Sequence, residues 1–339
     1  MTTDSEASAV RVPSEDRPRK LATSIDAQDR VFRGTARIGG TLVLLIMSLV
    51  GAFLLLQGYT AIDVAGIDFL TTEAWEPNGG NFGIIAVLCG TFFIAITAIV
   101  IATPLAIGTG LYISEYAPRG VKRGLIALVD LMAAIPSVVY GLWGAFFLQP
   151  LILPVSQWIA TYFSWIPIFR VTGFDPQDPL ASPTVFTASS FIAGIVVALM
   201  IAPIASSIMR EVFSQAPLGE REGALALGST RWGMITSVVL PFGRGGIIGG
   251  TMLGLGRALG ETIAVYLIIS PVFVIQPRIL EKGANSISAL IALRYGEASP
   301  FELSALMAAG LALFLVTLAV NFGASAVISR SRSGASSEA

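Results

Sequence analysis

The chain has 339 residues, of which 54% are hydrophobic and 13% are charged, and its mean hydropathy is +0.77. Soluble domains carry about 25% charged residues, so this composition predicts an integral membrane protein. The net charge of −1 gives no reason to expect a nucleic-acid partner, because the topology of a membrane protein divides its charges between two sides.

The lack of histidine and the single cysteine exclude several kinds of chemistry. A chain without histidine cannot build His-based metal sites, Ser–His or Cys–His nucleophile pairs, or imidazole proton relays. Cys89 stands alone and cannot form an internal disulfide. We therefore expect no catalytic centre and no metal site in this chain.

Six apolar segments are long enough to cross a bilayer. They cover residues 38–56, 83–113, 125–149, 184–208, 247–270 and 303–328. The polar tail before them, residues 1–37, is too long for the start of a signal peptide. Its first 23 residues have the composition of a disordered segment, and residues 24–37 suit a short helix on the inner membrane surface. These segments predict a membrane domain over residues 38–328 and a C-terminal tail over 329–339.

The basic residues favour an orientation with both termini in the cytoplasm. This orientation places 16 of the 21 Lys and Arg residues on the inner side, including those of the long loop 209–246. On the outer side, the loop 150–183 holds several aromatic residues between Pro154 and Pro167. We expect this aromatic segment to be a helix in the headgroup layer rather than a seventh span.

The fifth span contains two charged residues, Arg257 and Glu261, and no other charge between Ile247 and Ile275. In a continuous helix Arg257 would lie near the middle of the membrane, where an ionised side chain costs at least ~2.5–3.5 kcal/mol. At positions i and i+4 the two side chains would share one face. Two interpretations stay open: an internal ion pair, or an arginine that binds a tetrahedral oxyanion with Glu261 as its counter-charge.

The loop 209–246 carries a second informative pattern. A helix of small residues is expected over Glu222–Leu227, Gly228 permits a sharp turn at positive φ, and a second apolar helix is expected to end near Pro241. Such an element can lie close against a partner, and the alternative is an ordinary amphipathic loop that caps the bundle. The spacing closely resembles the coupling loop of ABC importer permeases, with Gly for the first Ala and Val for Ile. The matching residues are Glu222, Gly223, Ala224, Gly228, Val238, Val239, Leu240 and Pro241.

In that family the coupling loop docks on a cytoplasmic ATPase, and this chain contains no ATP-binding motif of its own. None of its three lysines follows a glycine, so a Gly-x-x-x-x-Gly-Lys-Ser/Thr phosphate loop is absent from the sequence. We therefore expect ATP and Mg²⁺ on a partner chain, and none on this one.

Further segments resemble bacterial phosphate ABC importer permeases of the PstC type. The segment Gly256–Thr262, which reads GRALGET, is similar to the family's GRAxGET segment, and Ala134–Gly141 and Pro104–Pro118 also match. The outer segment Phe69–Gly83 resembles PstC subunits rather than their PstA partners. The resemblance covers residues 38 to about 328. It implies an all-α fold like that of type I ABC importer permeases, with six transmembrane helices and a short cytoplasmic coupling helix.

The resemblance also implies partners and functional residues. It implies a bacterial inner-membrane complex with a PstA-type permease, a dimer of PstB-type ATPases, and an external PstS-type phosphate-binding protein. The phosphate pathway maps to Arg257 and Glu261, with Thr262 in the same segment. Coupling to the ATPase maps to Glu222, Gly223, Ala224, Gly228, Leu240 and Pro241.

Two residues of the third span are further pathway candidates. Ser137 follows Pro136, where a break can free backbone groups and line a cavity, although a simple kink is the alternative. Asp130 stands where the family more often has Glu. About one turn into the expected span, it suits a helix N-terminus, and a role near the inner mouth of the pathway is the alternative.

Other functions compete with phosphate import. An ABC permease for sulfate or molybdate would share the coupling loop, but an intramembrane Arg–Glu pair favours an anion that can still carry a proton. An ion-driven secondary transporter would leave the coupling loop unexplained. An intramembrane enzyme has little support in a chain without histidine.

Overall fold

The computed structural model describes residues 27–175 and 182–332, most of which are helical. The described residues up to Val50 and those from Gly51 onward form two separate units, and helix α1 (Ala27–Ala65) passes from the first into the second. The tail expected to be disordered lies outside the described residues. The described part of the short surface helix expected over residues 24–37 is the beginning of α1 itself, so a separate helix is not present there.

The remaining elements all belong to the second unit. Its long helices are α2 (Ile85–Leu111), α3 (Arg119–Ala134), α5 (Gln149–Phe163), α6 (Ser190–Ser214), α9 (Leu240–Gly260) and α12 (Pro300–Arg332). Its short helices are α4 (Ser137–Trp143), α7 (Leu218–Ala226), α8 (Arg231–Met234), α10 (Ile263–Ile268) and α11 (Ile287–Arg294). Three π-helical segments are η3 (Tyr112–Tyr116), η4 (Gly144–Leu148) and η7 (Ile235–Val239). Strands β1 (Trp75–Glu76) and β2 (Asn81–Phe82) form an antiparallel hairpin.

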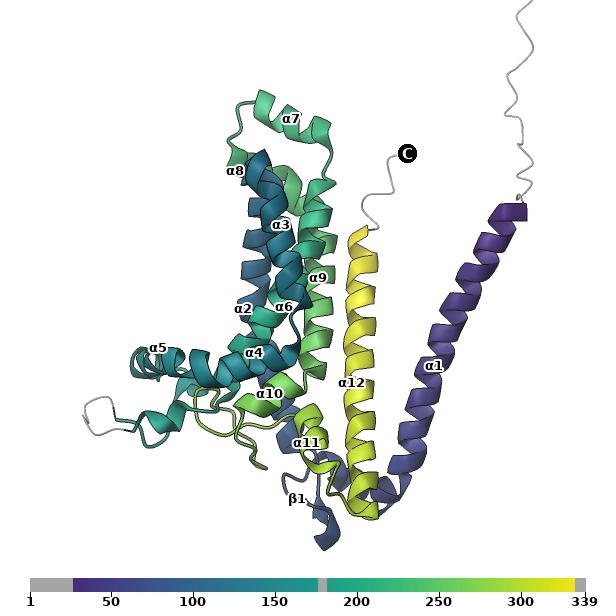
Figure 1. Ribbon diagram of the computed structural model, residues 1–339, viewed down its shortest axis with the longest axis vertical. Coiled ribbons are helices and arrows are strands. Elements are labelled where there is room, and N and C mark those ends of the chain that lie inside the picture. Colours follow the sequence, from purple (N-terminus) through teal and green to yellow (C-terminus); the bar gives the residue numbers. More distant parts are fainter. Residues whose placement is uncertain (1–26, 176–181, 333–339) are drawn as a thin grey trace, which may run out of the picture. The chain divides into compact units, whose positions relative to one another are not determined.

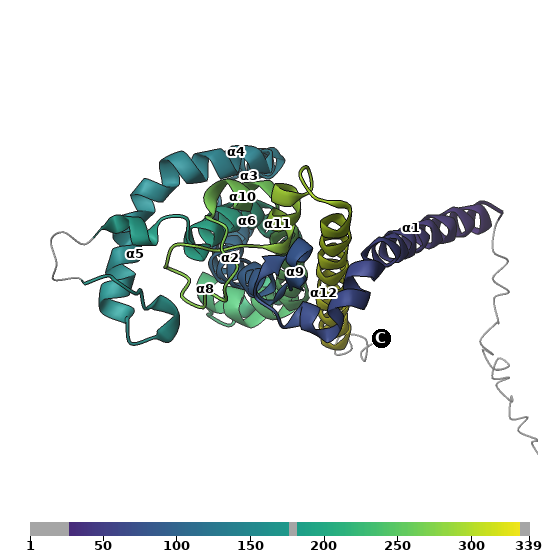
Figure 2. The same ribbon diagram turned by 90° about the horizontal axis from the view of Figure 1, so that it is seen from below.

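The core of the second unit is a bundle in which α2, α6 and α9 pack on one another, with α3 beside α6 and α12 beside α9 (Figures 1 and 2). Small residues let these helices approach closely. A Cβ atom added to Gly194 on α6 would lie 2.6 Å from the side chain of Thr97 on α2. Helix α7 caps one end of the bundle, and β1 and α11 lie at the other (Figure 1).

The number of spans expected from the sequence is confirmed, since six helical runs among the described residues have the length and hydropathy of membrane spans. They are Gln28–Leu70, Ile85–Tyr116, Ser137–Phe163, Ser190–Ser214, Arg231–Gly260 and Pro300–Gly323. The chain is therefore a multi-pass membrane protein. The first, second, fourth and sixth runs agree with expectation apart from their ends.

The expected third span, residues 125–149, is wrong because the helix breaks at Ile135. Proline disfavours helical geometry in the preceding residue, and Ile135 is extended (φ −65°, ψ 130°). Helix α3 stays alongside α6, whereas α4 and α5 lie crosswise to the long helices of the bundle, with α5 at its side (Figures 1 and 2). The span-length run starts only at Ser137, and the separate aromatic helix expected after Pro154 is the second half of α5.

The fifth span begins sixteen residues earlier than expected, at Arg231 instead of residue 247, and also ends earlier. The second helix of the 209–246 loop was expected to end near Pro241, but it continues directly into α9. The π-helical segment Ile235–Val239, which lies just before Pro241, explains the difference. A wider turn accommodates a proline ring that would clash with a regular helical turn.

The close approach of α2 to the loop before α11 gives a stability prediction. A Cβ atom on Gly90 would lie 2.0 Å from the backbone oxygen of Asn285, which cannot move as a side chain can. We expect Gly90→Ala to destabilise the protein by about 1–3 kcal/mol, the usual range for overpacking. Gly108→Ala is the matched control, because the same helix leaves that position open. Thermal unfolding in detergent measures both, and equal stability of the two variants would contradict the packing.

Candidate functional site

The charged pair of the fifth span lies at a helix break. Helix α9 ends at Gly260, so Arg257 occupies its last turn, where the negative end of the helix dipole favours a cation. Glu261 is extended (φ −69°, ψ 127°), and α10 begins at Ile263. The prediction that both side chains share one helical face is therefore wrong. Within the described residues, no ion pair joins Arg257 to Glu261.

Glu261 is buried at the break, with 8% of its surface exposed. Its Oε1 atom accepts a hydrogen bond from the backbone N–H of Ala264 at 3.3 Å, which caps the start of α10. Its backbone oxygen accepts a hydrogen bond from the Ser288 hydroxyl on α11 at 2.7 Å. The acid thus holds the break together, a role that the sequence did not indicate.

Two helix breaks face one another at this point. The break before α4 and the break before α10 are adjacent, because a Cβ atom on Gly141 of α4 would lie 2.8 Å from Cα of Ala264 on α10. Between the breaks lies an open cavity of about 450 Å³. Its lining residues are Ser137, Arg257, Gly260, Glu261, Thr262 and Ile263.

This cavity unites four of the five pathway candidates. Ser137, Arg257, Glu261 and Thr262 come from two distant parts of the sequence and line one space. The Arg257 side chain is exposed, and among the described residues it has no ion-pair partner, so its planar set of donors is available to an oxyanion. Discontinuous helices line substrate sites in membrane transporters for this reason: their freed backbone and polar side chains meet away from lipid.

Asp130, the fifth candidate, lies elsewhere. Helix α3 begins at Arg119, so Asp130 is near the end of the helix and not in its first turn as expected. Its carboxylate accepts a hydrogen bond from the Ser207 hydroxyl on α6 at 3.2 Å. Asp130 therefore links α3 to α6, and it does not line the cavity between the breaks.

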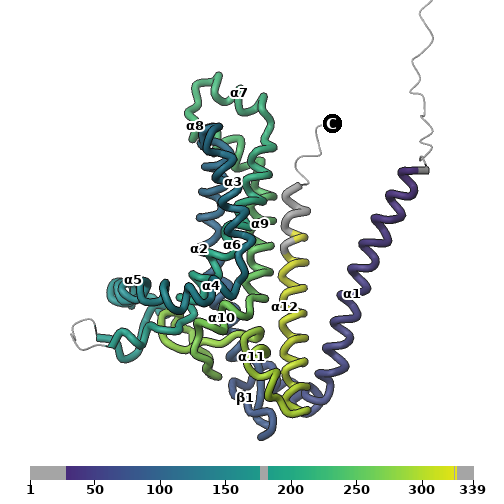
Figure 3. Tube along the Cα trace, in the orientation of Figure 1, coloured from purple at the N-terminus to yellow at the C-terminus, as the bar shows by residue number. Residues whose placement is uncertain are grey.

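The element expected to couple to an ATPase projects at the end of the bundle. The chain turns from α6 into α7, reverses at Gly228 and returns through α8 into α9 (Figure 3). Gly228 has φ +84°, which confirms the turn expected there, whereas the preceding helix begins at Leu218 rather than Glu222. None of the residues of α7 is buried.

The coupling candidates are exposed to different degrees. Exposed side chains include those of Glu222 and Pro241 together with the apolar Leu218 and Leu227. Gly223 and Gly228 are exposed as well. Ala224 and Leu240 are half-buried against the core at this end of the bundle. The exposed apolar surface around Glu222 is typical of a docking site for a partner.

Arg221 fixes α7 to the bundle, which sequence reasoning missed. Its guanidinium forms an ion pair with Glu115 of η3 at 3.2 Å, and the two side chains are only 17% and 6% exposed. It also donates to the backbone oxygen of Phe213 at the end of α6. The signal was present in the sequence as an arginine beside the Glu222 motif and an acid in the matched Pro104–Pro118 segment.

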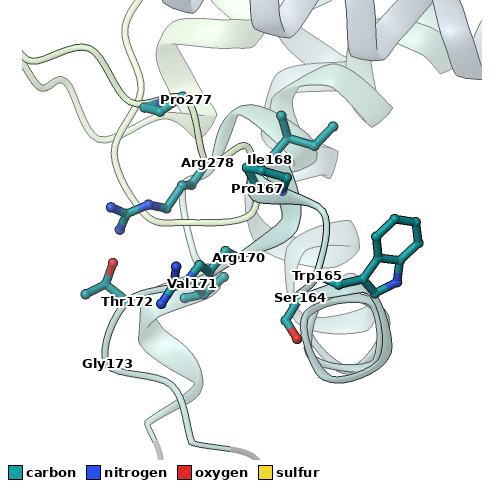
Figure 4. Close-up of a pocket in the computed structure, with 10 residues that line it drawn as sticks. All are labelled: Ser164, Trp165, Pro167, Ile168, Arg170, Val171, Thr172, Gly173, Pro277 and Arg278. Carbon is teal, nitrogen blue, oxygen red and sulfur yellow. The ribbon is translucent and has the colours of Figure 1, made fainter.

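A larger cavity, of about 600 Å³, lies among the loops that follow α5 and α10 (Figure 4). It contains Arg170 and Arg278, but Arg278 is paired with Glu281 at 2.9 Å. Glu281 also accepts hydrogen bonds from Thr172 at 3.4 Å, so these contacts join the two loops. We assign the candidate functional site to the smaller cavity, because it lies at the two helix breaks and holds both Arg257 and Glu261.

Comparisons with known proteins show the family of the chain. Residues 102–333 match the family of binding-protein-dependent transport system inner membrane components. The chain is 36% identical over 303 residues to the phosphate transport system permease protein PstC 2 of Mycobacterium tuberculosis, covering 88% of this chain and 91% of that protein. It is 37% identical over 287 residues to the PstC protein of Xylella fastidiosa, covering 84% and 85%.

A solved structure supports the fold. A bacterial ABC transporter involved in the import of the acidic polysaccharide alginate aligns with a TM-score of 0.51 at 19% identity, covering 89% of this chain and 99% of that one. The all-α architecture expected for an ABC importer permease is thereby confirmed. The chain belongs to the family of binding-protein-dependent transport system inner membrane components, within which it is a permease of the PstC type.

Proposed function

We propose that this chain forms half of the pathway of an ATP-driven importer for inorganic phosphate, and that Arg257 is the ligand for the anion. The observation that carries the proposal is the cavity between the two helix breaks, into which Ser137, Arg257 and Glu261 are brought. The names of the PstC relatives support phosphate as the substrate.

The two charges at the site have complementary effects on an entering anion. The Arg257 guanidinium matches two oxygens of a tetrahedral oxyanion, and the Ser137 hydroxyl at the start of α4 supplies another donor. Glu261 lies in the same cavity and repels a fully deprotonated anion, whereas hydrogen phosphate retains a proton that it can donate to a carboxylate. The pair therefore favours phosphate over sulfate and keeps binding weak enough for release.

The partners follow from the surfaces of the chain. The exposed face of α7 around Glu222 suits a PstB-type ATPase, which would carry the ATP and Mg²⁺. The open side of the cavity suits a PstA-type permease as the other half of the pathway. A PstS-type binding protein would deliver phosphate from outside. The basic residues support an inner-membrane orientation with both termini in the cytoplasm.

Replacement of Arg257 tests the proposal directly. We expect Arg257→Gln to lower phosphate uptake at least tenfold while the complex still assembles, since a hydrogen bond to a charged group is worth about 1.5–3 kcal/mol. The measurement is uptake by proteoliposomes that contain the partner subunits, with sulfate as the comparison ion. Arg244→Gln is the control, because Arg244 is an exposed arginine on the same helix. Wild-type uptake by Arg257→Gln, or transport of sulfate alone by the unmodified complex, would refute the assignment.

Replacement of Glu261 separates its charge from its capping role. Glu261→Gln keeps an acceptor for the Ala264 N–H, so we expect normal thermal stability but reduced phosphate uptake. Glu261→Ala removes the cap as well and should cost about 0.5–2 kcal/mol of stability. Thermal unfolding and uptake are measured on both variants. If Glu261→Gln transports like the wild type, the acid is only a structural cap.

Replacement of Gly228 tests the coupling element. A β-branched residue cannot adopt φ +84° without strain of about 1–2 kcal/mol, so we expect Gly228→Val to distort the α7–α8 turn. ATP hydrolysis per phosphate transported should then rise in the reconstituted complex. Gly228→Asn, which tolerates positive φ, should retain most of the coupling. An unchanged ratio in Gly228→Val would remove the turn from the coupling path.

A further inference from the structure

Arg257 lines a second cavity on another side of α9. This cavity has a volume of about 370 Å³ and lies where α6, α9 and α12 meet. Its lining residues are Ile204, Leu253, Gly256, Arg257, Thr317 and Asn321. The guanidinium thus stands between two spaces that both contain polar side chains.

Two polar residues of this second cavity, Thr317 and Asn321, lie in an otherwise apolar stretch of α12. Thr317 and Asn321 are the only residues from 305 to 324 whose side chains can form hydrogen bonds. An amide without a partner is costly in a membrane span, so such residues usually face a partner or a pathway. At positions i and i+4, Thr317 and Asn321 lie on one face of α12, and that face borders Arg257.

Asn321 lies against the turn of α9 that carries Arg257. A Cβ atom on Gly256 would be 3.5 Å from Oδ1 of Asn321 and 4.0 Å from its Nδ2. The backbone oxygen of Asn321 accepts from the Ser325 hydroxyl at 3.0 Å. Within the described residues, however, the amide side chain of Asn321 has no hydrogen-bond partner, and it is exposed. Its two N–H donors are therefore available to a ligand.

The second cavity extends from Arg257 toward the α7 end of the bundle. Helix α9 runs away from that end and α12 runs toward it (Figure 1). Leu253 precedes Arg257 by one turn, and Asn321 follows Thr317 by one turn. Leu253 therefore lies nearer α7 than Arg257 does. Asn321, in contrast, is level with Gly256, and Thr317 lies one turn farther from α7.

We propose that Thr317 and Asn321 form a second binding station for the oxyanion, which lies beside Arg257 and exchanges the anion with it. The station rests on the proposed function of Arg257. Its donors are an amide and a hydroxyl, both suited to phosphate oxygens. Unlike the first cavity, its lining residues include no carboxylate, so the anion meets Glu261 on one side of Arg257 only.

The test compares two replacements of Asn321 in the complete complex with its partner subunits. Asn321→Leu removes the donors, and Asn321→Asp keeps the size and polarity but adds a charge that repels an anion. We expect both to lower phosphate uptake about tenfold or more in proteoliposomes, while Asn321→Asp still assembles. Ser325→Ala is the control, since it removes a hydroxyl of the same helix that donates to the backbone oxygen of Asn321.

Normal transport by Asn321→Asp would overturn the second station, and the behaviour of Asn321→Leu then shows what Asn321 does instead. Wild-type uptake by Asn321→Asp shows that no anion passes this amide. Loss of co-purification in Asn321→Leu together with normal transport by Asn321→Asp shows that Asn321 is a polar contact to the other permease. The proposed function fails separately, by wild-type uptake of Arg257→Gln. Wild-type uptake of Asn321→Asp beside an inactive Arg257→Gln removes the station alone.

Discussion

A helix within a membrane can be interrupted only where its freed backbone groups find partners in the protein. This chain interrupts two helices side by side and satisfies both breaks with side chains. At the first break the Tyr140 hydroxyl donates to the backbone oxygen of Met132 at 2.9 Å. At the second, Glu261 and Ser288 provide the partners. These contacts stabilise the two interrupted helices, and the cavity lies between the interruptions.

The same contacts explain how an acid is tolerated at the site. The carboxylate of Glu261 is buried but has a backbone N–H as its donor, so it does not depend on Arg257 for stabilisation. Arg257 lies at the end of α9, where the helix dipole favours its charge. Each charge is thus stabilised by backbone, which leaves both side chains able to respond to an anion.

The sequence predicts those features that depend on local pattern. Hydropathy predicted the number of spans and the approximate place of four of them, and the need for positive φ located the turn at Gly228. The charged pair was identified by its cost in lipid, although its geometry was wrong. No proline or long polar run marks the end of α9 after Gly260, because the contacts that hold this break come from Ser288, far along the chain. Such long-range contacts leave no periodicity to detect.

The predicted position of Asp130 in its helix was wrong for a local reason. Hydropathy places the start of a span where the apolar residues begin, but the basic residues from Arg119 onward are already helical. The same basic turns extend α3 toward the α7 end, and Pro136 then stops the helix. An apolar window therefore started the expected span inside α3 and joined α3 to α4 across the break.

The fifth span is one continuous helical run that connects the α7–α8 turn to Arg257. The run Arg231–Gly260 has 30 residues and contains a π-helical segment in place of a break at Pro241. At 1.5 Å per residue it is about 45 Å long, with the α7–α8 turn at one end and Arg257 at the other. The Arg221–Glu115 ion pair ties α7 to the end of α2. A displacement imposed on α7 therefore acts on the bundle and on the helix that carries Arg257, whereas Glu261, beyond the break, can stay with α10 and α11. A relative movement of the two charges is the simplest way in which this architecture could open and close the proposed anion site.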